Sequence, residues 1–193
     1  MKSITVFCGA SGGSDQVYVS QATALGATLA QRNIHVIYGG ARIGIMGAVA
    51  DGALAAGGSV TGVIPKFLRT KEVAHAGLTS LLLVETMHER KMKMHELCDG
   101  IIALPGGFGT LEELFEVLTW AQLGLHQKPI AILNVAGYYD HLVNMIQTMV
   151  DKGFLKELNQ KMLLVSDNID ELLNMMSSYI APEVEKWVTD ETT

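Results

Sequence analysis

Cysteine, aromatic residues and positive charge are all scarce in this sequence. Its only cysteines, Cys8 and Cys98, are too few for a disulfide scaffold and lack metal-ligand spacing. We therefore expect the protein to be located in the reducing cytoplasm and to hold no structural metal. The formal net charge of −6 argues against a nucleic-acid polymer or an anionic membrane surface as a partner. No apolar run reaches the roughly 18 residues of a membrane span, and the first apolar stretch is too short for a signal peptide.

The sequence is rich in small and aliphatic residues. Hydrophobic residues make up 49% of the 193 residues, charged residues make up 18%, and there are 20 glycines. This composition excludes a disordered chain and favours an α/β enzyme domain whose strands are buried on both faces. The length predicts a single nucleotide-binding catalytic domain over residues 1–181, followed by a C-terminal tail over residues 182–193.

Strand-like and helix-like segments alternate along the chain. Short apolar runs predict strands over residues 4–8, 34–38, 59–64, 81–84, 101–104 and 130–133. Helices are expected over residues 15–32, 44–57, 86–98, 110–123, 138–152 and 168–180. This alternation predicts a Rossmann-like, doubly wound parallel sheet with helices on both faces.

Glycine-rich turns follow three of the expected strands, over Cys8–Ser14, Tyr38–Gly47 and Leu104–Thr110. Beyond the carboxyl ends of parallel strands, the N-termini of helices can hold anions, so the turns favour a nucleotide or sugar-phosphate site. None of the three turns has the dinucleotide fingerprint or the P-loop pattern, which favours a mononucleotide. A single glycine turn would be weak evidence, because glycine is common at any tight connection between a strand and a helix.

Two charged residues allow both a structural and a functional interpretation. Thr110 and Glu113 have the spacing of a helix capping box, in which Glu113 would only bond the backbone at the cap. On the expected helix 86–98, Met87, Met94 and Leu97 form an apolar stripe that should face inward. Arg90 interrupts this stripe, so its guanidinium should face inward as well and need a partner. That partner could be a structural carboxylate, or a substrate phosphate or purine edge. Lys91 follows Arg90 and could supply a second cation.

Longer motifs carry a resemblance to a known family. The segments Met87–Lys91 and Pro105–Glu113 resemble the LONELY GUY family of cytokinin-activating phosphoribohydrolases, and the resemblance extends from the first glycine turn to Gly137–Asp140. Members of that family are Rossmann-like homodimers, and many have carried the label lysine decarboxylase. Ala41 departs from the pattern, since many members have a third glycine in the second turn.

The resemblance implies hydrolysis of the N-glycosidic bond of AMP, or of AMP substituted on its exocyclic amine, to free base and ribose 5-phosphate. Arg90 and Glu113 match the catalytic pair of the family, and no metal or other cofactor is implied. A carboxylate near the anomeric carbon suits this chemistry, because it can stabilise an oxocarbenium-like state and orient water. The matching substrate-binding positions are Glu72, Lys91, Gly107, Phe108, Gly109, Thr110, Leu111, Glu112 and Thr119.

The glycine-rich turns and the family label leave two other classes of function open. A non-catalytic carrier of a nucleotide or of molybdenum cofactor would share the glycine-rich turns. An amino-acid decarboxylase would need pyridoxal phosphate, and no residue pattern identifies its Schiff-base lysine. Apolar residues in the helices, Met92, Met94 and the segment 114–125 among them, predict a homodimer.

Overall fold

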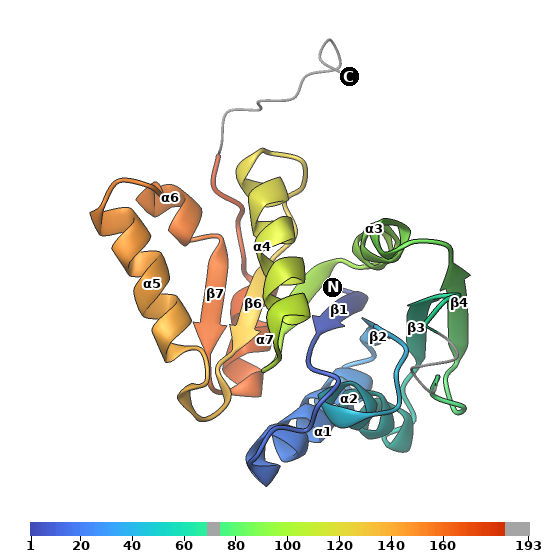
Figure 1. The fold of residues 1–193 in the computed structure, drawn as a ribbon. Coiled ribbons are helices and arrows are strands. Elements are labelled where there is room, and N and C mark those ends of the chain that lie inside the picture. Colours follow the sequence, from blue (N-terminus) through green and yellow to red (C-terminus); the bar gives the residue numbers. More distant parts are fainter. Residues whose placement is uncertain (69–73, 184–193) are drawn as a thin grey trace.

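Seven parallel strands form the centre of the protein in a computed structural model that describes residues 1–68 and 74–183 (Figure 1). The strand order in the sheet is β4-β3-β2-β1-β5-β6-β7, and every pairing in it is parallel. The strands are β1 (Ser3–Phe7), β2 (His35–Tyr38), β3 (Val60–Pro65), β4 (Ser80–Val84), β5 (Gly100–Ala103), β6 (Ile130–Leu133) and β7 (Leu163–Ser166). The inner strands are almost entirely buried, as expected for apolar runs covered on both faces.

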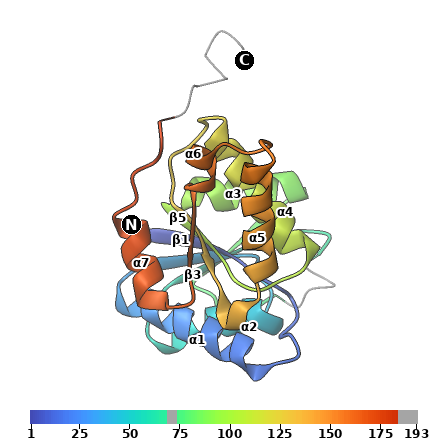
Figure 2. The same ribbon diagram turned by 90° about the vertical axis from the view of Figure 1, so that its left-hand side faces the viewer.

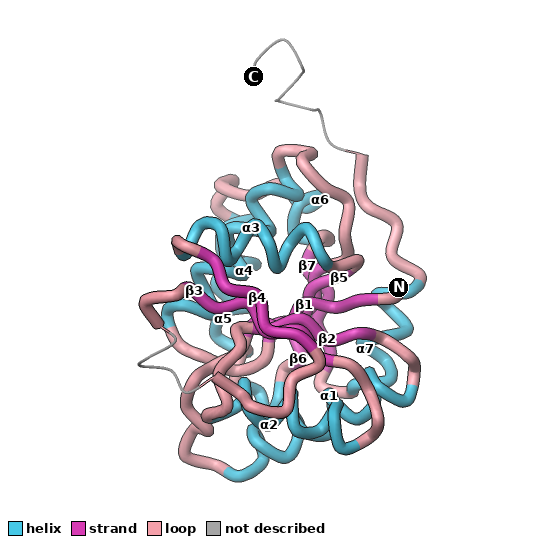
Figure 3. Tube along the Cα trace, turned by 90° about the vertical axis from the view of Figure 1, so that its right-hand side faces the viewer, coloured by secondary structure: helices cyan, strands magenta, loops and turns pink. Residues whose placement is uncertain are grey.

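Helices cover both faces of the sheet, which lies between them in Figure 3. The helical segments are α1 (Gln16–Gln31), α2 (Gly44–Ala55), α3 (Met87–Leu97), α4 (Phe108–Gln122), the 3-10 turn η1 (Val135–Gly137), α5 (Asp140–Asp151), α6 (Glu157–Gln160) and α7 (Ile169–Ser177). One apolar core joins the sheet to α1, α2 and α7, and the other joins it to α3, α4 and α5. Helix α5 lies next to α4 in Figure 2, and residues of both helices line one groove.

The ends of the helices differ in how their first backbone N–H groups are satisfied. Side chains cap α1, α3 and α7, where Asp15, Thr86 and Asn168 each accept a hydrogen bond from the first turn. Helices α2 and α4, which follow the second and third glycine turns, have no such cap. Their first-turn donors are therefore satisfied by other groups or are open to a ligand.

The structure confirms the predicted fold class and adds elements that the sequence analysis missed. Strand β7 and helix α6 are short, four residues each, and were not predicted. The expected helix 138–152 corresponds to α5, which is preceded by the unpredicted turn η1, and α4 begins two residues before the expected start at Thr110. Within the described residues, no helix is both long and apolar enough to span a membrane. The expected tail lies outside the described residues from residue 184 onward, and the domain boundary stays a prediction.

Candidate active site

The strand order of the sheet has a topological switch point between β1 and β5. From β1 the chain proceeds to β2, β3 and β4 on one side, and from β5 to β6 and β7 on the other. In open α/β sheets ligands bind in the crevice at such a switch point, beyond the carboxyl ends of the strands. The first and third glycine turns meet there, because the N–H of Gly9 donates to the carbonyl of Pro105 at 3.1 Å.

The second glycine turn does not offer the N-terminus of α2 to a ligand. The N–H of Ile45 donates to the carbonyl of Ser11 at 3.3 Å, and the N–H of Met46 donates to the carbonyl of Gly9 at 3.2 Å. The first glycine turn thus caps α2 through its own backbone. Because the N–H groups of Ile45 and Met46 are already paired, they are not available to an anion. The anion site expected from three glycine turns therefore has fewer backbone donors than the sequence suggested.

The N-terminus of α4 is open by contrast. Its cap residue is Gly107, and the first helical bond runs from the N–H of Leu111 to the carbonyl of Gly107. No acceptor among the described residues pairs with the N–H of Phe108, Gly109 or Thr110. A Cβ atom at Gly107 or Gly109 would meet no atom within 4 Å, so a ligand can reach this backbone from outside. Open donors at the positive end of a 15-residue helix form a site for an anion such as phosphate.

Arg90 and Glu113 form a buried ion pair beside these donors. The Nη1 atom of Arg90 lies 2.7 Å from Oε1 of Glu113, and the two side chains are 10% and 9% exposed. The Nε atom of Arg90 donates to the carbonyl of Val63 at 3.1 Å, which fixes the guanidinium plane. Both residues line a cavity of ≈ 330 Å³ in the crevice, together with Gly107, Gly109 and others. The capping-box interpretation of Glu113 is therefore wrong, since α4 is capped at Gly107 and Glu113 pairs with α3.

The second glycine turn makes room for the guanidinium. A Cβ atom at Gly39 would lie 2.2 Å from Nη2 of Arg90, so only glycine leaves space at this position. This use of the turn was not predicted. On α3 the buried side chains are those of Arg90, Lys91 and Met94, whereas Met87 and Leu97, which were expected to face inward, are 37% and 38% exposed.

Burial changes the protonation chemistry of the site. Loss of water raises the pKa of the Glu113 carboxyl, and the nearby Arg90 charge opposes that rise. A carboxyl in this position can take a proton more readily than an exposed one. Cys8 also lines the cavity, but burial raises the pKa of its thiol, so the sulfur is held as the weakly nucleophilic thiol.

The raised pKa of Glu113 predicts how stability depends on pH. A carboxyl that binds its proton more tightly in the folded state stabilises the fold below its unfolded pKa of about 4.3 and loses that contribution as pH rises through its folded pKa. We expect the free energy of unfolding of the wild type, minus that of Glu113→Gln, to fall as pH rises above about 4.3. Urea titrations of both proteins across this range measure the difference. A difference that grows with pH would contradict the assignment.

Lys91 lies outside the crevice in the structure. Its Nζ atom contacts Oε1 of Glu112 at 2.5 Å and Oε2 of Glu116 at 2.9 Å, and its side chain is 8% exposed. It is not among the residues that line the cavity of Arg90 and Glu113. In the single chain Lys91 ties α3 to α4 next to the Arg90–Glu113 pair, and its contact with substrate stays a prediction.

Of the remaining substrate-binding positions implied by the resemblance, some lie in the crevice and others lie away from it. Thr110 is buried and lines the crevice, whereas the side chain of Phe108 is 94% exposed, which leaves its backbone N–H as its possible contact. Leu111 packs against the core beneath α4. Thr119 donates its hydroxyl to the carbonyl of Phe115 and lines a groove between α4 and α5, away from the crevice. Glu72 lies outside the described residues.

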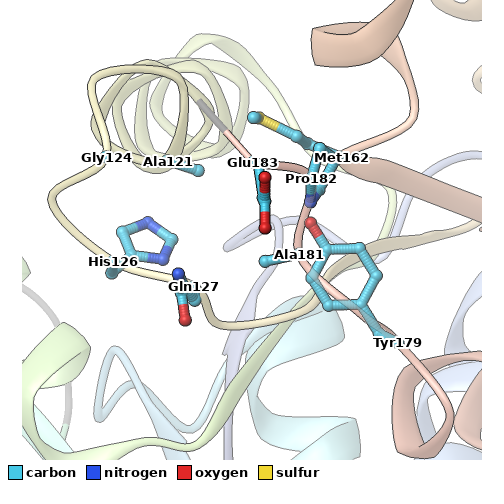
Figure 4. A pocket seen from close by; sticks show the side chains of 9 residues that line it. All are labelled: Ala121, Gly124, His126, Gln127, Met162, Tyr179, Ala181, Pro182 and Glu183. Carbon is cyan, nitrogen blue, oxygen red and sulfur yellow. The ribbon is translucent and has the colours of Figure 1, made fainter. Parts of the chain in front are cut away.

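Another cavity, of ≈ 250 Å³, lies at the amino ends of β6 and β7, opposite to the carboxyl ends that form the crevice (Figure 4). His126 and Gln127 from the loop before β6 form one side of it, and Tyr179 from the segment after α7 forms another. The residues that line it include none of the glycine turns and neither Arg90 nor Glu113. The crevice at the carboxyl ends of β1 and β5 is therefore the candidate active site.

Solved structures share this fold at low sequence identity. The molybdenum cofactor binding protein from Rippkaea orientalis superposes with a TM-score of 0.69 at 20% identity, covering 92% of this chain and 97% of that one. The Moco carrier protein from Chlamydomonas reinhardtii gives a TM-score of 0.69 at 18% identity, covering 91% and 94%. At these identities the likeness shows the fold alone.

The fold and the site define a doubly wound α/β protein with an anion-binding helix N-terminus beside a buried arginine–glutamate pair. The profile of the family described as "Possible lysine decarboxylase" matches residues 46–176. The chain is 41% identical to the cytokinin riboside 5′-monophosphate phosphoribohydrolase LOG2 of Arabidopsis thaliana over 98% of this chain and 91% of the relative, and 47% identical to the phosphoribohydrolase of that name from Rhodococcoides fascians over 88% and 86%. It belongs to the LONELY GUY (LOG) family, which confirms the resemblance.

Proposed function

We propose that this protein hydrolyses the N-glycosidic bond of purine nucleoside 5′-monophosphates, releasing the free base and ribose 5-phosphate. The observation that carries the proposal is the buried Arg90–Glu113 pair in one crevice with the open N-terminus of α4. The pair suits the developing charges of a ribosyl transfer, and the helix N-terminus suits a 5′-phosphate.

The phosphate supplies binding energy remote from the bond that breaks. The N–H groups of Phe108, Gly109 and Thr110 donate to its oxygens, and the helix dipole adds favourable charge. Binding there positions the ribose over the crevice floor. The apolar side chains of Met46 and Met87 line the same cavity and shield the reacting centre from bulk water.

The chemical step needs one carboxylate and one water molecule. As the bond between the anomeric carbon and the base nitrogen breaks, its electron pair leaves with the base, and the ribosyl group becomes oxocarbenium-like. The Glu113 carboxylate stabilises that positive charge and accepts a proton from the water that attacks the anomeric carbon. Arg90 stabilises negative charge on the departing base by electrostatics. The base takes up one proton from solvent, and Glu113 returns the proton of the attacking water to solvent. The raised pKa of Glu113 suits its role as the proton acceptor.

The names of the relatives support this activity and a cytokinin-type substrate, an AMP whose exocyclic amine carries a substituent. The carrier function draws only on likeness of fold, at 20% identity or less. Among the described residues that line the crevice there is no lysine, so they offer no Schiff-base partner to pyridoxal phosphate.

Incubation with a panel of nucleoside monophosphates, nucleosides and lysine tests the proposal. We expect base release from AMP or an N6-substituted AMP, much slower release from the matching nucleoside, and no carbon dioxide from lysine. Tight nucleotide binding without any base release would favour the carrier function instead.

We also propose that the protein is a homodimer that acts in the cytoplasm. Both cysteines are free and buried, which suits a reducing compartment. The apolar surface lies partly where the sequence analysis placed it, since Met92 is 45% exposed, but Met94 and Leu114 belong to the core. Met87 and Leu97 of α3 are exposed as well, but at a spacing of five residues they do not share one face of the helix with Met92.

Light scattering at micromolar concentration measures the oligomeric state. We expect about twice the mass of one 20.8 kDa chain. Met92→Lys should lower that mass towards the monomer, because burying an unpaired ammonium at an interface is costly. Met145→Lys, at an exposed position on α5, is the control and should remain dimeric. A monomeric wild type would refute the dimer.

A further inference from the structure

Three consecutive carbonyl groups in the turn after β5 each accept a hydrogen bond. The carbonyl of Leu104 accepts from the hydroxyl of Tyr139 at 2.7 Å, and that of Gly106 accepts from the hydroxyl of Tyr138 at 2.6 Å. Between them, the carbonyl of Pro105 accepts from the N–H of Gly9. Two neighbouring tyrosines and the first glycine turn therefore fix the three peptide groups that lead into the cap of α4.

The two tyrosines reach this turn because the segment before α5 has an unusual backbone. Ala136 has φ 51° and Gly137 has φ 70°, so two successive residues adopt the left-handed conformation. For Ala136 that conformation is strained, and such strain persists only where surrounding contacts hold it. The side chain of Asn134 supplies these contacts, as it accepts from the N–H of Tyr139 at 2.7 Å and donates to Asp140 at 2.7 Å.

The direction of the carbonyls decides the direction of the amides. In a trans peptide the N–H points opposite to the C=O, so a fixed carbonyl at Pro105 or Gly106 also fixes the N–H of the next residue. No acceptor among the described residues pairs with the N–H of Gly106 or Gly107. They extend the row of open donors that begins α4. Gly106 is held closely as well, since a Cβ atom there would lie 2.1 Å from Oγ1 of Thr110.

We propose that Tyr138 and Tyr139 are positioning residues that hold the turn Leu104–Gly107 so that its amides and those of α4 converge on the 5′-phosphate. This inference deepens the proposed function and rests on it for the identity of the ligand. Tyr138 is the better residue to test, because it is 43% exposed and removal of its hydroxyl leaves the core intact, whereas Tyr139 is only 2% exposed.

Tyr138→Phe removes the hydroxyl and keeps the ring. Loss of one hydrogen bond to the turn should weaken binding of ribose 5-phosphate, measured by calorimetry, by about three- to tenfold. With a nucleoside monophosphate as substrate, KM should rise by a similar factor while kcat stays within about twofold, because the Arg90–Glu113 pair is untouched. Hydrolysis of the matching nucleoside, which has no phosphate, should not change.

Tyr18→Phe is the matched control. Tyr18 packs edge-on against Tyr138, with ring centroids 5.9 Å apart, and its hydroxyl has no hydrogen-bond partner among the described residues. It should bind ribose 5-phosphate as the wild type does. The inference fails if Tyr138→Phe binds ribose 5-phosphate like Tyr18→Phe, or if its KM rises equally for nucleotide and nucleoside. Because the calorimetric result needs no turnover, it stands apart from the outcome of the activity assay.

Discussion

Glu113→Gln is expected to lower turnover of a nucleoside monophosphate by about 100-fold or more while binding of the nucleotide stays nearly unchanged. Glutamine keeps the shape of the side chain and can still accept from Arg90, 2.7 Å away. It carries no negative charge to stabilise an oxocarbenium-like ribose, and it cannot take the proton of the attacking water. The phosphate contacts come from the backbone at the start of α4, which the substitution does not alter. Steady-state kinetics with a nucleotide titration separates the two effects.

Glu116→Gln provides the control for this experiment. Glu116 lies on the same helix and contacts Lys91, but it does not line the crevice. Removing its charge should change turnover by no more than a few-fold. Near-normal turnover in Glu113→Gln would overturn the assignment of Glu113, as would an equal loss in both variants.

Arg90→Met is expected to abolish turnover and to lower the free energy of unfolding by about 3–5 kcal/mol. The substitution leaves the Glu113 carboxylate, 9% exposed, without its opposite charge. A buried unpaired charge is costly, so the effect on stability should exceed that of most surface changes. Denaturant unfolding at neutral pH measures the stability, and the base released from a nucleotide measures the turnover.

A double variant distinguishes the two roles of Arg90. In Arg90→Met with Glu113→Gln no buried carboxylate remains to be paired, so we expect part of the lost stability to return. Activity should not return, because both charges of the proposed mechanism are absent. A double variant no more stable than Arg90→Met would show that the ion pair is not the reason for the loss.

The sequence predicted the parts of the protein that depend on local pattern. Apolar runs located six of the strands, and the inward position of Arg90 followed from helical spacing. Strand β7 (Leu163–Ser166) was missed, although it is as long as β2, β5 and β6 and has an apolar run like theirs. Helix α4 begins at Phe108 with Gly107 as its cap residue, so the side-chain cap expected at Thr110 is absent.

Features of the site that depend on long-range contact could not be predicted. Nothing local to Gly39 indicates that it leaves room for Arg90, which lies 51 residues later in the chain. The backbone bonds that occupy the start of α2 also join separate turns. Likewise, Tyr138 and Tyr139 reach the turn after β5 only through a left-handed turn at Ala136, a conformation that alanine rarely adopts. The signal available for them was the motif Gly137–Asp140.

Quantifying every product from an N6-substituted AMP in phosphate-free buffer tests the central claim most directly. If Arg90 and Glu113 hydrolyse the N-glycosidic bond, free base and ribose 5-phosphate will appear in equal amounts, and no inorganic phosphate will be released. Unchanged nucleotide after long incubation with folded protein, or a nucleoside together with inorganic phosphate, would contradict the account.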